Sequence, residues 1–172
     1  MTKPNIRFMT QADIPRVAEI HVAGWRNTYR GIVADEVLFG RMSVSRSTER
    51  FTQLLRTGND DSYVYDDGIT KGFMTIMPCR NDDTPDAFEL GGIYIDPAFQ
   101  HTGIGTIMIA AFEKIASQKG YSCLCLWVLT ENNQARRFYE KMGYAPDGTS
   151  QFLDRLNAWE VRYTKNIIED VI

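Results

Sequence analysis

The chain has 172 residues, of which 44% are hydrophobic and 24% are charged, and its formal net charge at pH 7 is −3. These values are typical of one globular domain, and the negative charge argues against a general nucleic-acid-binding protein. No apolar run approaches the roughly 20 residues that span a bilayer, and the first ten residues lack the apolar core of a signal peptide. We therefore expect a single domain over residues 1–172 in the cytoplasm, with neither a membrane nor a nucleic-acid partner.

The chain opens with the signals of a strand followed by a helix. Residues 5–10, NIRFMT, resemble a strand, and Thr10 with Asp13 forms the S/T-x-x-D/E pattern of a helix start. Apolar residues at helical spacing then predict a helix over residues 14–29, with Gly24 as its weakest position.

A second helical region and two strands are predicted next. Residues 35–56 have a helical pattern that is broken near residues 41–45. The segments 62–67 and 72–78 alternate between apolar and polar residues, and the turn signal DDG joins them. Because this connection is short, the two strands should pair antiparallel.

The middle of the chain predicts a strand with an irregularity. A polar loop, residues 80–86, leads into the strand AFELGGIYID, residues 87–96. Gly91 and Gly92 interrupt this strand, and paired glycines mark a bulge or a close approach of the backbone.

The second half of the chain alternates helices and strands. It predicts a helix over 103–120, a strand over 121–129, a helix over 131–143 and a strand over 157–165. A polar stretch, residues 145–151, precedes the last strand, so the chain ends in one or two strands. Strand–helix–strand connections favour parallel neighbours, whereas the first half favours antiparallel ones. The sequence therefore predicts an α/β fold with a mixed sheet flanked by helices.

The cysteines predict neither a disulfide framework nor a metal site. Cys79, Cys123 and Cys125 are an odd number, and the last two share one face of the predicted strand. His21 and His101 are the only histidines that could complete a zinc site, and the set of ligands is not convincing. We interpret the cysteines as buried or half-buried free thiols.

The stretch DPAFQHTGIGTIMI, residues 96–109, leads from a strand through a glycine loop into a helix. Free amides of such a loop, together with the positive end of the helix dipole, suit a diphosphate. The stretch lacks the Gly-Lys-Ser/Thr of a nucleoside triphosphatase, and Met108 stands where a dinucleotide fingerprint has its third glycine. The loop of Gly103 and Gly105 could also be purely structural.

Three segments together resemble the GNAT superfamily of N-acetyltransferases, which transfer acetyl from acetyl-CoA to an amine. GGIYIDPAFQHTGIGTIMI is similar to the central CoA motif of that superfamily, including its Gln-x-x-Gly-x-Gly pattern, and VLTENNQARRFYEKMGY is similar to the motif that follows. The opening HVAGWRNTYRG is similar to the first helices of many small members. The resemblance implies a mixed, mostly antiparallel sheet, splayed between its fourth and fifth strands so that acetyl-CoA can enter.

The resemblance also implies where the cofactor is held. The strand backbone beside the two glycines would bind the pantetheine arm, the loop amides would bind the pyrophosphate, and Asn132 and Phe138 would contact the pantetheine and the thioester end. The residues implied are Ile93, Tyr94, Ile95, Gln100, His101, Thr102, Gly103, Ile104, Gly105, Thr106, Asn132, Phe138 and Tyr139.

Two adjacent positions depart from the superfamily pattern. Many members have Gly and a Lys or Arg where this sequence has His101 and Thr102, so a cationic partner for phosphate is missing from the loop unless His101 is protonated. Backbone amides can still hold the anion. Arg136, Arg137 and Lys141 either reach the adenosine phosphates or are exposed charges on a helix.

Two residues are candidates for proton transfer. By the resemblance, Tyr139 would protonate the leaving CoA thiolate; the alternative is an aromatic residue that packs against its neighbours. Glu89 occupies a strand position where some members have a carboxylate base for the incoming amine; the alternative is a solvated carboxylate.

Aromatic residues on the first helix are candidates for the acceptor pocket. Trp25 and Tyr29 are four residues apart and share a helix face, as does His21. Tyr94 is a third aromatic candidate, and core packing is the alternative for Trp25. His21 is more readily explained as a structural histidine than as a base.

These observations predict an N-acetyltransferase that moves acetyl directly to a primary amine of a small molecule or a protein. No cysteine lies in a motif that would support a covalent acetyl-enzyme. The alternative is a non-catalytic module that binds or senses acyl-CoA. A homodimer is suggested only by analogy with relatives, and the sequence does not identify the amine.

Overall fold

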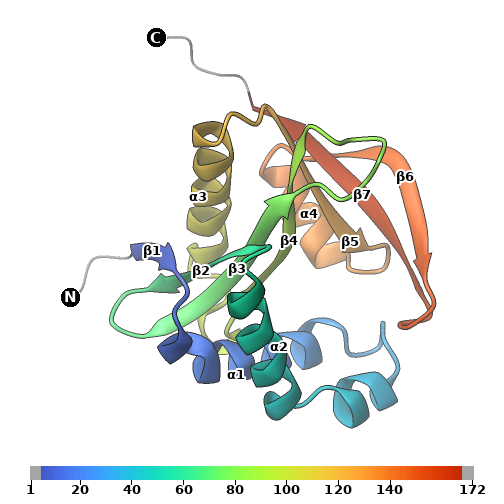
Figure 1. The fold of residues 1–172 in the computed structure, drawn as a ribbon. Helices are drawn as coiled ribbons and strands as arrows, with labels where there is room; N and C mark the ends of the chain where they lie inside the picture. Colours follow the sequence, from blue (N-terminus) through green and yellow to red (C-terminus); the bar gives the residue numbers. More distant parts are fainter. Residues whose placement is uncertain (1–4, 168–172) are drawn as a thin grey trace.

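The computed structural model describes residues 5–167, which form a seven-stranded sheet with helices on both faces (Figure 1). The strand order is β1-β2-β3-β4-β5-β7-β6, and every neighbouring pair is antiparallel except β4–β5. The expected α/β fold with a mixed, mostly antiparallel sheet is confirmed. The strands are β1 (Asn5–Phe8), β2 (Asp61–Asp66), β3 (Thr70–Pro78), β4 (Ala87–Ile95), β5 (Cys123–Leu129), β6 (Ala145–Leu153) and β7 (Ala158–Asn166).

The helices cover the sheet in two groups. On one face, α1 and α2 pack over β2 and β3 around residues such as Ile20, Phe51 and Phe73. On the other face, α3 packs over β3 and β4, and Tyr139 of α4 joins the same buried cluster. No helix among residues 5–167 is long and apolar enough to cross a membrane. The four α-helices of the described residues are α1 (Ile14–Thr28), α2 (Val44–Thr57), α3 (Ile104–Gln118) and α4 (Asn133–Lys141). A π-helical segment (Glu36–Arg41) lies between α1 and α2, and 3₁₀ turns lie at Gln11–Asp13 and Pro97–Phe99.

The start of α1 follows the predicted capping pattern. Thr10 and Asp13 form a reciprocal capping box, in which the Thr10 amide and hydroxyl both donate to Asp13 at 2.8 Å. A short 3₁₀ turn, Gln11–Asp13, precedes the α-helix. The helix continues through Gly24 without a break, and a side chain there would press on the Tyr94 ring, 3.3 Å from the ideal Cβ position. Gly24 is therefore a close-packing site and not a point of weakness.

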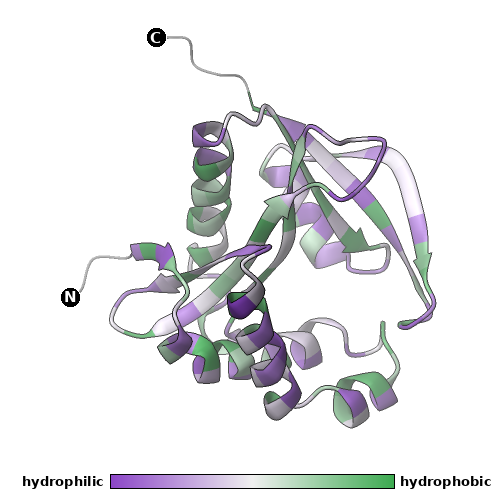
Figure 2. Cartoon of the chain, in the orientation of Figure 1, coloured by the Kyte–Doolittle hydropathy of each residue, from purple (hydrophilic) through white to green (hydrophobic). Residues whose placement is uncertain are grey.

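Residues 145–151, predicted only as a polar stretch before the last strand, belong to strand β6, so the chain ends in the larger of the two expected numbers of strands. This strand pairs only with β7, lies at the sheet edge and is exposed along most of its length. Its polar composition follows from that position, and the register shift between Pro146 and Ser150 accommodates a proline and a glycine. Figure 2 shows the contrast between the hydrophobic β5 and the paler, more polar β6.

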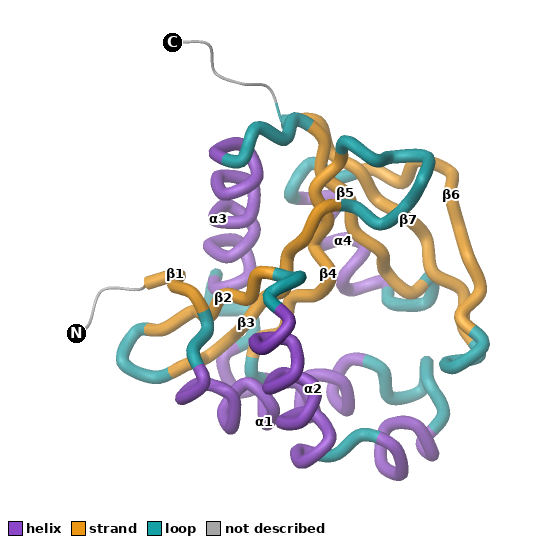
Figure 3. Tube along the Cα trace, in the orientation of Figure 1, coloured by secondary structure: helices purple, strands orange, loops and turns teal. Residues whose placement is uncertain are grey.

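The polar loop between β3 and β4 is held by hydrogen bonds to β7, which lies beyond β5 in the sheet. Arg162 of β7 is 3% exposed and donates to both carboxylate oxygens of Asp83 in the loop, at 2.7 and 2.6 Å. The same guanidinium donates to Asp147 of β6 at 2.6 Å. Figure 3 shows this loop in teal beside β7 and β6. The loop is therefore anchored through Asp83, although most of its residues are exposed, as its polar composition indicates.

His21 is a buried structural residue. It is 5% exposed, its Nδ1 lies 3.0 Å from the Ser47 hydroxyl, and rings of Phe51, Phe73 and Tyr94 surround it edge-on. Burial, with a smaller contribution from Arg50, lowers the pKa of His21 from 6.5 to about 4. The structural interpretation of this histidine is confirmed.

Acid should destabilise the fold through His21. Between pH 6.5 and about 4 the unfolded chain binds a proton that the folded chain does not, so the free energy of unfolding falls as pH falls through this window. A His21→Asn variant keeps a hydrogen-bonding group but does not titrate. We expect the wild type to lose about 2 kcal/mol more than this variant between pH 7.5 and 4.5, measured by urea unfolding. A His101→Asn variant, at an exposed position, should follow the wild type; equal losses in the wild type and His21→Asn would contradict the assignment.

Candidate active site

The sheet opens into a cleft because β4 and β5 separate halfway along their length. They pair in parallel only from Ala87–Cys123 to Leu90–Leu126. Beyond Leu90, β4 continues to Ile95 with β3 as its sheet neighbour, while β5 continues beside β7. The resulting cleft has a volume of about 950 Å³. The splay between the fourth and fifth strands is therefore present (Figure 1).

The glycine pair lies at the point of separation. The register between β3 and β4 shifts at Thr75/Ile76, so Gly91 is the extra residue of a bulge, as predicted. A Cβ at Gly91 would lie 2.4 Å from the Met77 side chain, and one at Gly92 would lie 3.0 Å from the Tyr94 ring. Glycine therefore leaves room for the Met77 methyl group and the Tyr94 ring where the strand bends away from β5.

The second pair of glycines shapes the loop before α3. Gly103 is the N-cap of α3 and has φ +88°, a conformation that favours glycine. A Cβ at Gly105 would lie 3.1 Å from the Phe138 ring, so this glycine permits α3 and α4 to approach. His101 also has a positive φ, 62°, at the position where many GNAT members have glycine.

Most residues predicted for the cofactor and the acceptor meet in this one cleft. Thr102 and Ile104 do not line it: the Thr102 hydroxyl donates to the Phe99 carbonyl at 2.7 Å, and the Ile104 side chain is buried under α3. Their expected contribution is through backbone amides, which this placement leaves unchanged. The cleft is lined by the predicted residues Trp25, Tyr29, Glu89, Ile93, Tyr94, Ile95, Gln100, His101, Gly103, Gly105, Thr106, Asn132, Phe138 and Tyr139.

The three cations of α4 have different surroundings. Arg137 and Lys141 line the cleft. Arg136 donates instead to the Thr130 carbonyl and to the Tyr163 hydroxyl, both at 3.0 Å. Arg136 is therefore a structural residue, and only Arg137 and Lys141 lie where they could reach a phosphate.

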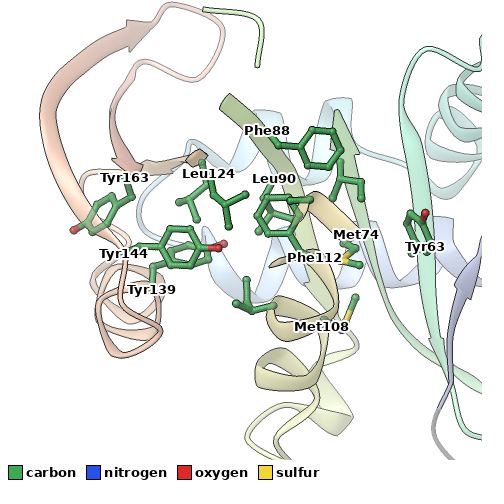
Figure 4. Close-up of a cluster of buried hydrophobic side chains, with 14 of the residues drawn as sticks. Tyr63, Met74, Phe88, Leu90, Met108, Phe112, Leu124, Tyr139, Tyr144 and Tyr163 are labelled. Carbon is green, nitrogen blue, oxygen red and sulfur yellow. The ribbon is translucent and has the colours of Figure 1, made fainter. Parts of the chain in front are cut away.

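Helix α4 carries Tyr139 into the cleft. The helix begins at Asn132, whose side-chain oxygen accepts from the Ala135 amide at 3.2 Å. Tyr139 is 8% exposed, and its ring centroid lies 5.4 Å from that of Phe138 and 6.1 Å from that of Tyr144. Figure 4 shows Tyr139 beside Tyr144 in the buried cluster. Burial, and to a lesser extent Tyr94, raises the pKa of Tyr139 well above its usual value. The hydroxyl is therefore protonated at neutral pH and can act as a donor.

The aromatic residues of α1 meet β4 across the cleft. Trp25 Nε1 donates to the Tyr94 hydroxyl at 3.0 Å, and the Trp25 and Tyr29 rings meet edge to face at 4.8 Å. Burial raises the pKa of Tyr29, and the nearby Tyr94 and Tyr139 raise it further. Trp25 thus lines the cleft and also packs against the buried cluster of Leu38, and its role in an acceptor pocket stays a prediction.

Glu89 is buried, which rules out the alternative of a solvated strand carboxylate. It is 4% exposed on β4, and its Oε1 accepts a hydrogen bond from Arg80 at 3.0 Å. Its Oε2 is buried and has no hydrogen-bond partner among the described residues. An unpartnered buried oxygen is costly, so this atom is free to accept a hydrogen bond or bind a cation within the cleft.

The far end of the cleft contains residues that the sequence did not indicate. Arg155 and Glu160, from the β6–β7 hairpin, lie there with Trp127 of β5. Glu160 accepts from Gln151 at 2.6 Å, and burial raises its pKa. Strand alternation places Trp127 on the same face as Cys125. In the structure, the β6–β7 hairpin packs against the segment between α1 and α2 through buried contacts of Val33, Leu38 and Leu156. No local sequence pattern indicates this packing.

A sheet opened beside a glycine loop and a helix N-terminus, with a buried tyrosine and a buried carboxylate in the gap, defines an acyl-CoA-dependent acyltransferase. The sequence model of the Acetyltransferase (GNAT) family matches residues 16–144, and the chain belongs to this family. It is accordingly an N-acetyltransferase.

Similar proteins, with and without a named substrate, are also described as N-acetyltransferases. The uncharacterized N-acetyltransferase YuaI of Bacillus subtilis (strain 168) is 27% identical over 148 residues, which cover 85% of this chain and 82% of that protein. The spermidine N(1)-acetyltransferase of Thermoplasma acidophilum is 25% identical over 149 residues, with 84% and 89% covered. The PaiA N-acetyltransferase of Thermoplasma acidophilum, solved with coenzyme A, has a TM-score of 0.75 at 21% identity, covering 96% of this chain and all of that one.

Proposed function

We propose that this chain transfers acetyl from acetyl-CoA directly to a primary amine, with Tyr139 as the general acid and Glu89 as the general base. The observation that carries the proposal is that these two buried groups, one on α4 and one on β4, line the same cleft. No covalent acetyl-enzyme is needed, because the two reactants can meet between the two residues.

The cofactor would occupy the gap between β4 and β5. The backbone of Ile93, Tyr94 and Ile95 has no β5 partner, so its outward-facing groups are available to the amides of pantetheine. The pyrophosphate would lie against the amides of residues 102–106 at the start of α3. The solved relatives with coenzyme A and with acetyl-CoA support this placement by their fold.

Tyr139 would act on the leaving group. Attack of the amine on the thioester carbonyl expels the CoA sulfur as a thiolate, which needs a proton. A tyrosine that stays protonated in a buried site can donate a hydrogen bond to that sulfur and then transfer the proton. The lining position of Phe138 beside it would keep water from the thioester.

Glu89 would act on the amine, which arrives mostly protonated at neutral pH. Its paired Oε1 is held by Arg80, and its unpartnered Oε2 can accept the ammonium proton directly or through a water molecule. Glu160 at the same end of the cleft adds a second carboxylate. We infer a cationic amine as the acceptor, consistent with a relative named for spermidine.

Replacement of Glu89 by Gln should lower kcat/KM at pH 7 by about 100-fold, the usual contribution of a positioned base. The deficit should shrink as pH rises towards the pKa of the amine, about 10.4 for an alkylamine, because the free amine then needs no base. Thiol release with spermidine and a panel of other amines measures this. A Glu49→Gln variant, at an exposed position on α2, is the matched control. A Glu89→Gln rate equal to the wild type at pH 7 would exclude this base.

The alternative of a non-catalytic acyl-CoA-binding module does not account for a buried tyrosine and a buried carboxylate facing one cleft. A panel in which no amine released thiol would favour that module. A single domain over residues 1–172, a cytoplasmic location and a homodimer stay predictions.

A further inference from the structure

Two thiols lie beside the carboxylate of Glu89. The Sγ atoms of Cys79 and Cys125 and a carboxylate oxygen of Glu89 all lie within 4.8 Å of one another. The two sulfurs are 3.2 Å apart, with the Cys125 thiol donating to Cys79. These three side chains, here called the thiol–carboxylate cluster, come from segments well separated in the sequence.

The sheet itself holds the cluster in place. Glu89 and Cys125 are register partners on β4 and β5, so their side chains project from the same face of the sheet. Cys79 directly follows β3, and its amide bonds to the Ala87 carbonyl of β4 at 2.9 Å. Cys125 is fully buried and Cys79 is half-buried, so the cluster is reached from the Cys79 side.

The Oε2 atom of Glu89 points to a missing ligand. Glu89 is more than nine-tenths buried, and this oxygen has no hydrogen-bond partner among residues 5–167. A buried acceptor without a donor requires an explanation, such as an ion that completes its interactions. Cysteine sulfur and carboxylate oxygen are both ligands that zinc takes in proteins, and zinc sites with three protein ligands leave a fourth position for water.

We propose that the thiol–carboxylate cluster is an inhibitory binding site for a thiophilic divalent cation, namely Zn²⁺. Sulfurs bound to tetrahedral zinc at about 2.3 Å lie about 3.8 Å apart. The two sulfurs of the cluster would separate by only about half an ångström to reach that geometry. The carboxylate selects Zn²⁺ over Cu⁺, which prefers sulfur ligands alone.

The charges of the site are consistent with this ion. Zn²⁺ would displace one proton from each thiol, and two thiolates with one carboxylate then leave the bound site with a net charge of −1. The Arg80 guanidinium, now paired with Glu89, would balance that charge. The Arg80 side chain is 68% exposed, so it can give up its hydrogen bond to Oε1 without leaving an unpaired charge buried.

The consequence for the enzyme rests on the proposed role of Glu89. A carboxylate that is bound to Zn²⁺ cannot accept the proton of the incoming amine, so metal binding and acetyl transfer exclude each other. The sequence predicts no metal site, because its three cysteines and two histidines are not a convincing set of ligands, and the pattern does not show that Glu89 lies beside Cys79 and Cys125. In the structure His21 is paired with Ser47, and the group contains neither histidine.

Co²⁺ is the first probe, because thiolate-to-cobalt charge transfer is seen by ultraviolet absorption without any assay of activity. The whole chain, reduced with a phosphine, is titrated with Co²⁺, and Zn²⁺ is then added to displace it. We expect one Co²⁺ per chain. Cys79→Ser and Cys125→Ser should each lower the affinity for Co²⁺ by at least about 100-fold, which is the most that is usually lost when a residue that only hydrogen-bonds to a metal ligand is replaced. The third cysteine provides the matched control: Cys123→Ser should bind as the wild type does.

Several results would overturn the site. They are a wild type without the charge-transfer band, an equal band in Cys79→Ser, or loss of the band in Cys123→Ser. Because Cys125 is fully buried, its replacement can impair folding, and the half-buried Cys79 then decides the question.

Acetyl transfer with and without Zn²⁺ tests the inhibition. Zn²⁺ should stop thiol release by the wild type, a chelator should restore it, and Cys79→Ser should keep its own metal-free rate at the same Zn²⁺ concentration. Cobalt binding without inhibition by Zn²⁺ would overturn the inhibitory role. The metal-free rate of Glu89→Gln tests the base separately, so failure of the proposed function and failure of the metal site give different results.

Discussion

A Tyr139→Phe variant should lose about 100-fold or more in the rate of acetyl transfer at saturating acetyl-CoA. The variant keeps the ring that packs against Phe138 and Tyr144, and it removes only the hydroxyl. Without a proton donor the CoA sulfur must leave as a free thiolate, so kcat should fall while cofactor affinity changes little. Thiol release and an acetyl-CoA titration measure the two quantities separately.

Tyr144 is the matched control for this experiment. It is a buried tyrosine of the same cluster, but its hydroxyl has no hydrogen-bond partner among the described residues and it does not line the cleft. A Tyr144→Phe variant should therefore retain the wild-type rate. Equal rates for Tyr139→Phe and the wild type would remove the acid role of Tyr139 but not the assignment to the family.

A Gly103→Val variant should weaken acetyl-CoA binding by about 100-fold. Gly103 lines the cleft, and its φ of +88° strains any β-branched residue. Relief of that strain would move the amides at the start of α3, and the loss of one or two charge-assisted hydrogen bonds, at about 1.5–3 kcal/mol each, accounts for the expected factor. Calorimetric titration of the reduced protein measures it directly.

Gly120, at the other end of α3, provides the control that distinguishes a loss of acetyl-CoA binding from a loss of stability. It has φ +84° and open space around it, as Gly103 does, but it lies outside the cleft. Gly120→Val should therefore destabilise the fold by a similar amount and bind acetyl-CoA normally. Normal binding by Gly103→Val, or equal loss of binding in both variants, would contradict the placement of the pyrophosphate.

The elements of the fold were predictable where their signals are local. The capping residues Thr10 and Asp13, the DDG turn and the glycines that end the helices act within a few residues of themselves. Strand β6 has no such signal, because an exposed edge strand with a single partner does not require apolar residues. Only the pairing with β7, across a hairpin, makes residues 145–151 a strand.

The site was predictable in part for the same reason. The glycine loop and Tyr139 belong to continuous motifs, so a resemblance could identify them. The far end of the cleft depends on how the β6–β7 hairpin packs against the segment after α1, which no continuous motif describes. The contact between Cys79 and Cys125 likewise spans β4 and follows from the order of the strands.

The open edge of β4 has a thermodynamic consequence for the cofactor. Before the cofactor binds, the backbone groups of residues 91–95 that face the gap must be hydrated, since β5 no longer supplies partners for them. Pantetheine would exchange these water contacts for equivalent ones, and each exchanged hydrogen bond contributes a net of only about 1 kcal/mol. On the proposed placement, the edge would therefore determine the register at which the arm lies along the strand. Most of the affinity would come from the diphosphate and from the apolar surface that leaves water.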